Sequence, residues 1–107
     1  MNREEAQQRA RALVAKMTVE EKASQLKFDA EAIPRLGIPA YNWWNEALHG
    51  VARAGLATVF PQSIGMAASF NDSLVYEVFT AVSDEARAKN VYYASKGSYE
   101  RYQGLTM

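Results

Sequence analysis

Polar side chains gather between residues 45 and 50, where Asn45, Glu46 and His49 directly follow the aromatic residue Trp44. Glu46 offers a carboxylate, His49 an imidazole that can donate or accept a hydrogen bond, and Trp44 a flat apolar face with one N–H donor. The sequence contains one histidine and no cysteine, which excludes a thiol nucleophile, a disulfide and a histidine-rich zinc site. A lone histidine is more often a hydrogen-bonded structural residue than a ligand or a base. We therefore expect a structural role for His49, and no metal or other cofactor.

The charge pattern restricts the class of partner. Twelve Lys and Arg residues balance twelve Asp and Glu residues, so the chain lacks the basic footprint of a nucleic-acid-binding protein. The N-terminal residues are charged and polar from Asn2 onward, without the apolar run of a secretory signal, which predicts a cytoplasmic location for the chain as given. No stretch approaches about 18 consecutive apolar residues, so we expect no membrane association.

Two helices are expected before residue 30. Apolar residues recur at helical spacing on one face of the segment 3–16. Thr18 precedes Glu21 by three residues, which is the spacing of a capping box and predicts a second, short helix with Ala23 and Leu26 facing inward.

Strand and helix patterns alternate after residue 39. Residues 40–44 read as a short strand, which places the polar cluster where the chain leaves a sheet, and residues 58–60 read as a second strand ended by proline. A long amphipathic helix begins at Asn71 or Asp72 and runs to about Asn90, with Glu85 and Lys89 among its solvated residues. Residues 104–107 look like the start of a third strand.

This alternation predicts an α/β fold with parallel βα units. Parallel strands are buried on both faces and need neighbours at both edges, so two strands and the start of a third indicate the opening portion of a larger sheet. Unpaired edges and an uncovered helix face predict that the chain alone forms oligomers or aggregates.

Four segments carry a family resemblance. They are TVEEK at 18–22, LGIPAYNWWNEALHGV at 36–51, TVFPQ at 58–62 and EARA at 85–88. In this order the chain resembles glycoside hydrolase family three over essentially all of its 107 residues. The stretch WNEALHG is similar to the branch of β-xylosidases and arabinofuranosidases, because the commoner β-glucosidases tend to have an aspartate before the A-x-H-G step.

The resemblance implies an incomplete (β/α)₈ barrel. Residues 1–107 would form its first two βα units with the preceding helices, and such barrels need roughly 250 residues. The rest of the barrel and a following α/β sandwich domain would be absent. In this family an aspartate nucleophile and a glutamate acid/base carry out retaining hydrolysis, and both would lie beyond Met107. No catalytic residue is therefore assigned to this chain.

Two substrate-binding residues follow from the resemblance. Glu46 matches the carboxylate that accepts hydrogen bonds from hydroxyls of the terminal sugar, and its length relative to aspartate would fill the space of a hexose hydroxymethyl group. Trp44 matches an aromatic residue that shapes the sugar pocket. The alternatives are a solvated glutamate at a helix start for Glu46 and a core tryptophan for Trp44, while Asn45 and His49 are expected to be structural residues beside the site.

The leading hypothesis is the N-terminal fragment of an exo-acting glycosidase that removes β-linked xylose, or arabinose, from plant oligosaccharides. The chain alone is then expected to be inactive, and its partners are the oligosaccharide and the rest of the enzyme. One alternative is a fragment of a β-glucosidase. Another, from a different class, is a truncated non-catalytic product that binds sugar weakly or mediates association.

Overall fold

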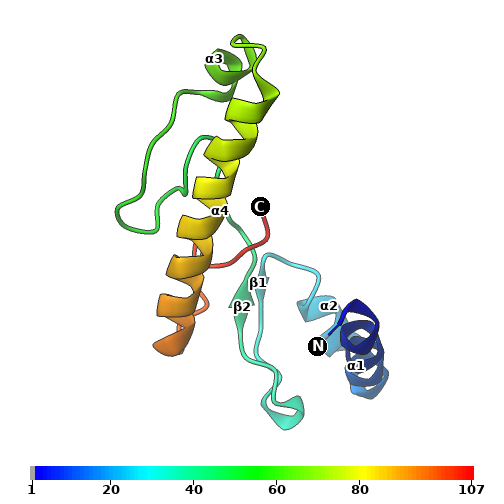
Figure 1. Ribbon diagram of the computed structural model, residues 1–107. Coiled ribbons are helices and arrows are strands. Elements are labelled where there is room, and N and C mark those ends of the chain that lie inside the picture. Colours follow the sequence, from blue (N-terminus) through cyan, green and yellow to red (C-terminus); the bar gives the residue numbers. More distant parts are fainter. Residues whose placement is uncertain (1) are drawn as a thin grey trace. The chain divides into compact units, whose positions relative to one another are not determined.

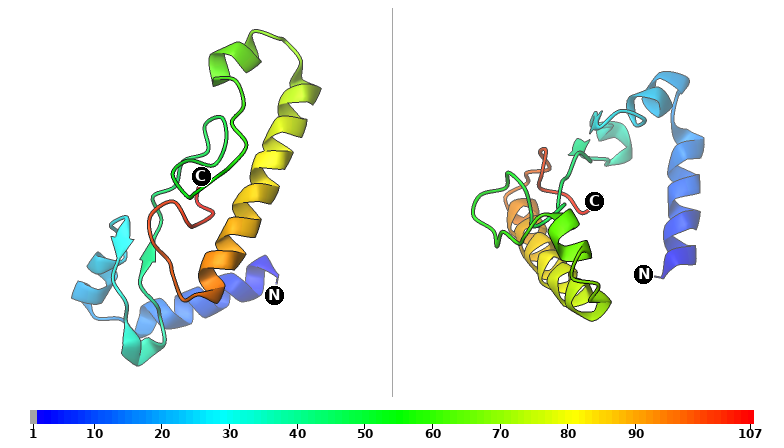
Figure 2. Two further views of the ribbon diagram at one scale, coloured as in Figure 1. Left: turned by 90° about the vertical axis from the view of Figure 1, so that its left-hand side faces the viewer. Right: turned by 90° about the horizontal axis from the view of Figure 1, so that it is seen from above.

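The structure of the protein is a computed structural model that describes residues 2–107. The chain divides into two compact units, the first ending at Tyr41 and the second spanning Asn42–Met107 (Figures 1 and 2). Within the described residues, no helix is both long and apolar enough to cross a membrane.

Two capped helices open the first unit. Helix α1 (Arg3–Lys16) begins at Asn2 and helix α2 (Val19–Ser24) begins at Thr18, and each N-cap forms a capping box with the glutamate three residues later. Such boxes satisfy backbone amides that the first turn of a helix leaves without partners. The sequence predictions of a helix over 3–16 and of a capping box at Thr18 are confirmed.

The rest of the first unit resembles a short β-hairpin. Strand β1 (Asp29–Ala30) pairs with β2 (Tyr41–Asn42), whose first residue ends the unit, and between them lies the 3₁₀ turn η1 (Pro34–Leu36). Ile33 and Ile38 exchange two backbone hydrogen bonds of 2.9 and 3.2 Å around this turn. Strand β1 was not predicted from the sequence, because two residues are too few to show a detectable period.

The helices of the first unit bury little of their apolar surface. Neither α1 nor α2 contains a buried residue, and the buried hydrophobic side chains in this unit belong to Ala30 and Ile33. The prediction that Ala23 and Leu26 face inward is wrong: Ala23 is exposed and Leu26 is 82% exposed. The capping boxes, rather than apolar burial, account for where these helices begin.

The second unit is built on a long helix and a loop that lies along it. Helix α3 (Ser63–Ala67) leads into α4 (Asp72–Ser95), which is capped by Asn71, one of the two residues predicted to cap it, and extends past the predicted end at Asn90. In both figures the segment 50–60 runs beside α4. Its core is a cluster of four buried residues, two from the loop and two from the helix: Val51, Ala54, Val82 and Ala86.

The predicted strand 40–44 is shorter in the structure, where only Tyr41 and Asn42 are in strand conformation. The side chain of Asn42 accepts a 3.0 Å hydrogen bond from the backbone amide of Trp44. Such a local side-chain bond offers the backbone an alternative to a β-ladder and ends the strand.

The predicted strands 58–60 and 104–107 are wrong, since neither segment is in strand conformation. At residue 58 the backbone amide donates to the side chain of Glu85 on α4 instead of to a neighbouring strand. At Gly104 the amide donates to the side chain of Asn45. Both backbone donors are therefore satisfied by side chains, and the barrel expected from the resemblance stays a prediction.

Candidate functional site

Trp44 and Glu46 lie on an extended segment that follows β2. The indole Nε1 of Trp44 lies 3.4 Å from Glu46 Oε1, so the two predicted sugar-binding side chains are neighbours on one face of this segment. Both are exposed, Trp44 with 42% of its surface accessible. Residues two apart on an extended chain point to the same side, which is why this spacing brings them together. The pair offers a carboxylate acceptor beside an aromatic face.

Arg101 is a third member of this face that the sequence analysis missed. Its guanidinium carbon lies 4.8 Å from the centroid of the Trp44 ring, a distance at which a cation is attracted to the aromatic face. The backbone amide of Tyr102 donates a 2.9 Å hydrogen bond to the carbonyl of Trp44, which brings the C-terminal segment alongside. No local signal in the sequence connects Arg101 with Trp44, because the contact depends on this long-range pairing.

Asn45 fastens the same segment to the C-terminal residues. Its side-chain amide donates to Thr106 Oγ1 at 2.8 Å, and its carbonyl oxygen accepts from the Gly104 amide at 2.8 Å. Thr106 Oγ1 in turn donates to the carbonyl of Trp43 at 2.8 Å. These bonds hold the backbone on both sides of Trp44.

His49 lies at the base of the loop that follows. Its Nδ1 is 3.0 Å from the carbonyl oxygen of Phe60, and the Phe60 amide donates a 2.8 Å bond to the His49 carbonyl. A carbonyl can only accept, so Nδ1 carries a proton in this contact. Among residues 2–107, no group of three or more His, Cys, Asp or Glu side chains is placed to hold a metal ion.

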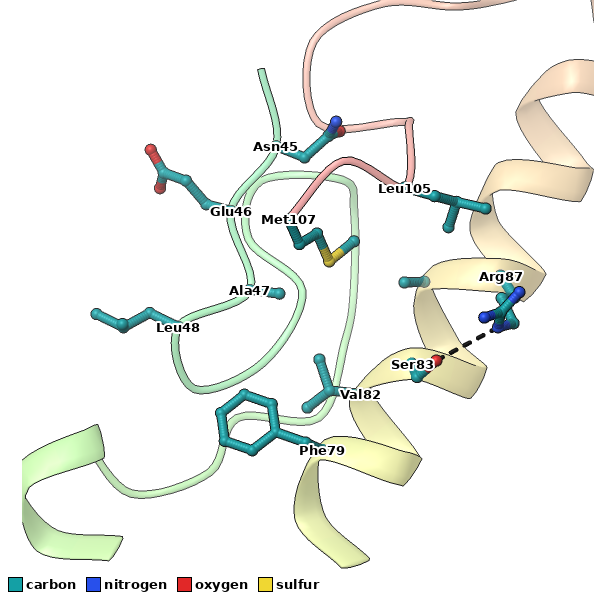
Figure 3. A pocket seen from close by; sticks show the side chains of 11 residues that line it. Asn45, Glu46, Ala47, Leu48, Phe79, Val82, Ser83, Arg87, Leu105 and Met107 are labelled. Atoms are coloured by element: carbon teal, nitrogen blue, oxygen red, sulfur yellow. Dashed lines mark hydrogen bonds between the residues drawn. The ribbon is translucent and has the colours of Figure 1, made fainter. Parts of the chain in front are cut away.

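An apolar groove of about 710 Å³ lies on the other side of the extended segment, between it, α4 and the C-terminal residues (Figure 3). Asn45 and Ala47 are directed toward this side, whereas the side chains of Glu46 and Leu48 point away from α4. The groove is lined mainly by apolar side chains, including Phe79, Val82, Ala86, Leu105 and Met107. A sugar needs polar partners, so the exposed face with Glu46 and Trp44 is the better candidate for sugar binding.

Two charged residues of α4 bind the loop 50–59. Glu85 accepts hydrogen bonds from the Thr58 amide at 3.0 Å and from Thr58 Oγ1 at 2.5 Å. Lys89, one turn further, donates to the carbonyl of Ala54 at 2.8 Å and to that of Leu56. The prediction that both side chains are simply solvated is wrong, because they satisfy the loop backbone.

The pKa of the Glu85 carboxyl is lowered from its ordinary value. The largest cause is the hydrogen bond from the Thr58 hydroxyl, followed by that from the Thr58 amide, and the positive charge of Lys89 adds to them. Hydrogen bonds to a carboxylate favour its ionised form.

Comparison with known proteins relates this chain to a class of enzymes. It is 52% identical to the probable exo-1,4-beta-xylosidase bxlB of Aspergillus flavus over 91 residues, which cover 75% of this chain and 12% of that protein. It is 50% identical over 84 residues to the xylan 1,4-beta-xylosidase of Xylanibacter ruminicola, covering 78% of this chain and 10% of that protein. The probable beta-D-xylosidase 7 of Arabidopsis thaliana is 47% identical over 100 residues, covering 84% and 13% respectively.

The comparisons also set limits. The chain matches no protein-family model and no solved structure. It spans between 10% and 13% of the length of the three relatives named above. Over three quarters or more of its own length, however, the chain is related in sequence to proteins named as β-xylosidases, which are glycoside hydrolases.

Proposed function

We propose that this chain is the N-terminal part of an exo-acting glycosidase that removes terminal β-linked xylose, or arabinose, from oligosaccharides. The observation that carries the proposal is identity of 47–52% to proteins named as xylosidases in a fungus, a bacterium and a plant. In the proposed enzyme, residues 1–107 form the first part of a (β/α)₈ barrel of glycoside hydrolase family three, and this chain alone holds only that incomplete part. Hydrolysis is retaining, and its two carboxyl groups come from residues outside this chain.

In this proposal Glu46 and Trp44 bind the terminal sugar. The Glu46 carboxylate accepts hydrogen bonds from sugar hydroxyls, and the Trp44 ring packs against the C–H face of the pyranose. Support comes from their exposure on a shared face, with 3.4 Å between Trp44 Nε1 and Glu46 Oε1. Glu46 is one methylene longer than an aspartate, so it fills the space that a hexose hydroxymethyl group needs and favours a pentose.

Asn45 and His49 support this face without touching the sugar. Asn45 bonds the C-terminal residues on one side of Trp44, and His49 closes the loop that follows Glu46 through its contact with Phe60. The side chains of Asn45 and His49 thus already have hydrogen-bond partners within the protein.

A chimeric enzyme tests the proposed substrate class. This chain replaces the aligned residues of the Xylanibacter ruminicola xylosidase, and kcat/KM is measured on nitrophenyl β-D-xyloside, β-D-glucoside and α-L-arabinofuranoside. We expect the xyloside to be the best substrate. A chimera that prefers the glucoside would contradict the proposal and favour the β-glucosidase alternative.

Glu46→Asp in this chimera tests the role of the side chain. Removing one methylene opens space beside the sugar, and pocket differences of this size change relative kcat/KM by roughly 10- to 200-fold. We expect a lower rate on the xyloside and a higher glucoside-to-xyloside ratio. The control is Glu77→Asp, an exposed glutamate on α4, which should leave the ratio unchanged. An unchanged ratio in Glu46→Asp would mean that Glu46 does not border the sugar.

The purified chain by itself should release no nitrophenol from nitrophenyl β-D-xyloside. Retaining hydrolysis needs two carboxyl groups about 5–5.5 Å apart across the glycosidic bond, and the proposal places both outside residues 1–107. Turnover by the chain alone would overturn this part of the proposal.

A further inference from the structure

The two halves of the loop Gly50–Val59 are held to α4 by different interactions. Its first half is anchored by apolar burial, because Val51 and Ala54 belong to the core cluster with Val82 and Ala86. Its second half is less deeply anchored: Ala57 packs against this cluster but is only partly buried, while Leu56 is 97% exposed and Val59 is 77% exposed. The second half therefore depends more on polar contacts with α4.

Glu85 and Lys89 supply these polar contacts. Together they bind three alternate residues of the loop through the carbonyls of Ala54 and Leu56 and the amide of Thr58. The two side chains lie at positions i and i+4 on α4, so one helix face presents an acceptor and a donor to the same stretch of backbone. We call this pair the clasp.

The same loop is bonded to the backbone of Glu46. The Ala52 amide donates a 2.9 Å hydrogen bond to the Glu46 carbonyl, and His49 and Phe60 close the base of the loop by reciprocal contacts. A displacement of the loop therefore moves the group that fixes the Glu46 peptide. Side chains on short extended segments take their direction from that backbone.

We propose that Glu85 and Lys89 are positioning residues for the sugar-binding face: by clasping the loop 50–59 to α4, they fix the Glu46 backbone through Ala52. The inference rests on the proposed sugar-binding role of Glu46. It assigns a function to two residues that lie far from Glu46 along the chain and that touch no sugar. It also explains why a loop with exposed apolar side chains keeps a defined path.

Hydrogen exchange of the complete 107-residue chain, read by mass spectrometry at residue resolution, tests the coupling. The variants are Glu85→Ala and Lys89→Met, with Glu77→Ala on the exposed face of the same helix as the control. We expect both clasp variants to lose protection at the Thr58 amide and also at the Ala52 amide. The helical signal in circular dichroism should stay unchanged, because alanine and methionine are strong helix formers.

A second pair of variants distinguishes loss of the Glu85–Thr58 contact from general unfolding of the chain. Thr58→Val keeps the shape of the side chain but removes the hydroxyl donor to Glu85, whereas Thr58→Ser retains a donor. Thr58→Val should lose protection at Ala52, and Thr58→Ser should restore it. Loss of protection confined to residues 54–58, with Ala52 as protected as in the parent chain, would overturn the inference.

A sugar titration separates this inference from the proposed function. D-xylose is added to the parent chain and to Glu85→Ala, and tryptophan fluorescence is followed. Weaker binding of xylose by Glu85→Ala, with Ala52 less protected, supports the inference. If the parent chain does not respond to xylose, the proposed role of Glu46 fails in this chain, while the exchange data still decide whether the clasp fixes the Glu46 backbone.

Discussion

The two units of the chain use similar polar groups for different purposes. In the first unit Glu21 accepts hydrogen bonds from Arg35, at 2.8 Å to its Nε, and from the Thr18 amide, which ties a helix start to the turn η1. In the second unit Glu85 accepts from the hydroxyl and amide of Thr58, beside a core cluster shared by loop and helix. In the first unit the charged residue Arg35 links the start of α2 to the turn η1 at the surface. In the second unit the neutral residue Thr58 holds a loop over an apolar core.

The largest expected difference between the units concerns two glycines. Gly50 has φ of +136°, and a Cβ there would lie 2.3 Å from the carbonyl oxygen of Thr58. Gly37 has φ of +67°, but a Cβ there would meet open space, so only backbone strain arises. We expect Gly50→Ala to destabilise the chain by about 3–5 kcal/mol and Gly37→Ala by about 1–2 kcal/mol.

Urea unfolding followed by circular dichroism measures both glycine variants at low micromolar concentration. The Gly50→Ala variant should also lose the protection of the Thr58 amide, since that residue must move to admit the methyl group. Equal effects of the two substitutions would show that the loop 50–59 adjusts freely and that its close approach at Gly50 has no structural importance.

The next expected effect concerns the core of the second unit. Val82 is 2% exposed, and Val82→Ala removes two methylene equivalents from the cluster with Val51, Ala54 and Ala86. At about 0.8 kcal/mol for each, with an added cavity cost, the loss is about 2 kcal/mol in the free energy of unfolding. Val91→Ala on the same helix is the control, because Val91 is 69% exposed and should cost little. A similar loss in both variants would contradict the assignment of the core.

The features of the structure that were predicted from the sequence are those determined by residues close together along the chain. The capping box of Thr18 and the Asn71 cap of α4 need only groups within three positions, and both are present. The Glu46–Trp44 contact was not predicted, although it is local and consistent with alternation along an extended chain.

The parts that sequence reasoning missed depend on distant partners. Residues 58–60 have the composition of a strand, yet Thr58 bonds Glu85 rather than another strand. Glu85 and Lys89 have the spacing of solvated helix residues, and only the path of the loop reveals their role. Arg101 joins the Trp44 ring through a chain reversal that no local pattern encodes.

A smaller effect is expected at the start of α2. Thr18 Oγ1 accepts a hydrogen bond from the Glu21 amide, so Thr18→Ala leaves that donor without its cap and should cost about 1 kcal/mol in helix stability. Hydrogen exchange at residues 19–24 measures the effect, and Thr18→Ser, which keeps the hydroxyl, is the control. If Thr18→Ala exchanges no faster than Thr18→Ser, the capping box does not stabilise this helix.

The smallest effect, and the sharpest comparison, lies in how pH and salt act on Glu21 and Glu85. The pKa of each carboxyl is lowered from its ordinary value of 4.5, chiefly by the Arg35 hydrogen bond at Glu21 and by the Thr58 hydroxyl at Glu85. A lowered pKa in the folded state means that the unfolded state binds protons more readily. The stabilisation is therefore complete above the unfolded value and is lost as pH falls through the folded value. Arg35→Met and Thr58→Val should each reduce stability at pH 7, and this reduction should disappear at an acid pH below the lowered pKa that the carboxyl has in the folded parent chain. Salt at 1 M, where the screening length is about 3 Å, should shrink the effect of Arg35→Met more than that of Thr58→Val, because only the first removes a charged partner. Urea unfolding at pH 7 and at the acid pH, each at low salt and at 1 M salt, measures this difference in salt dependence between the two variants. Equal salt dependence of the two variants would mean that Glu85 is held by the charge of Lys89 rather than by Thr58.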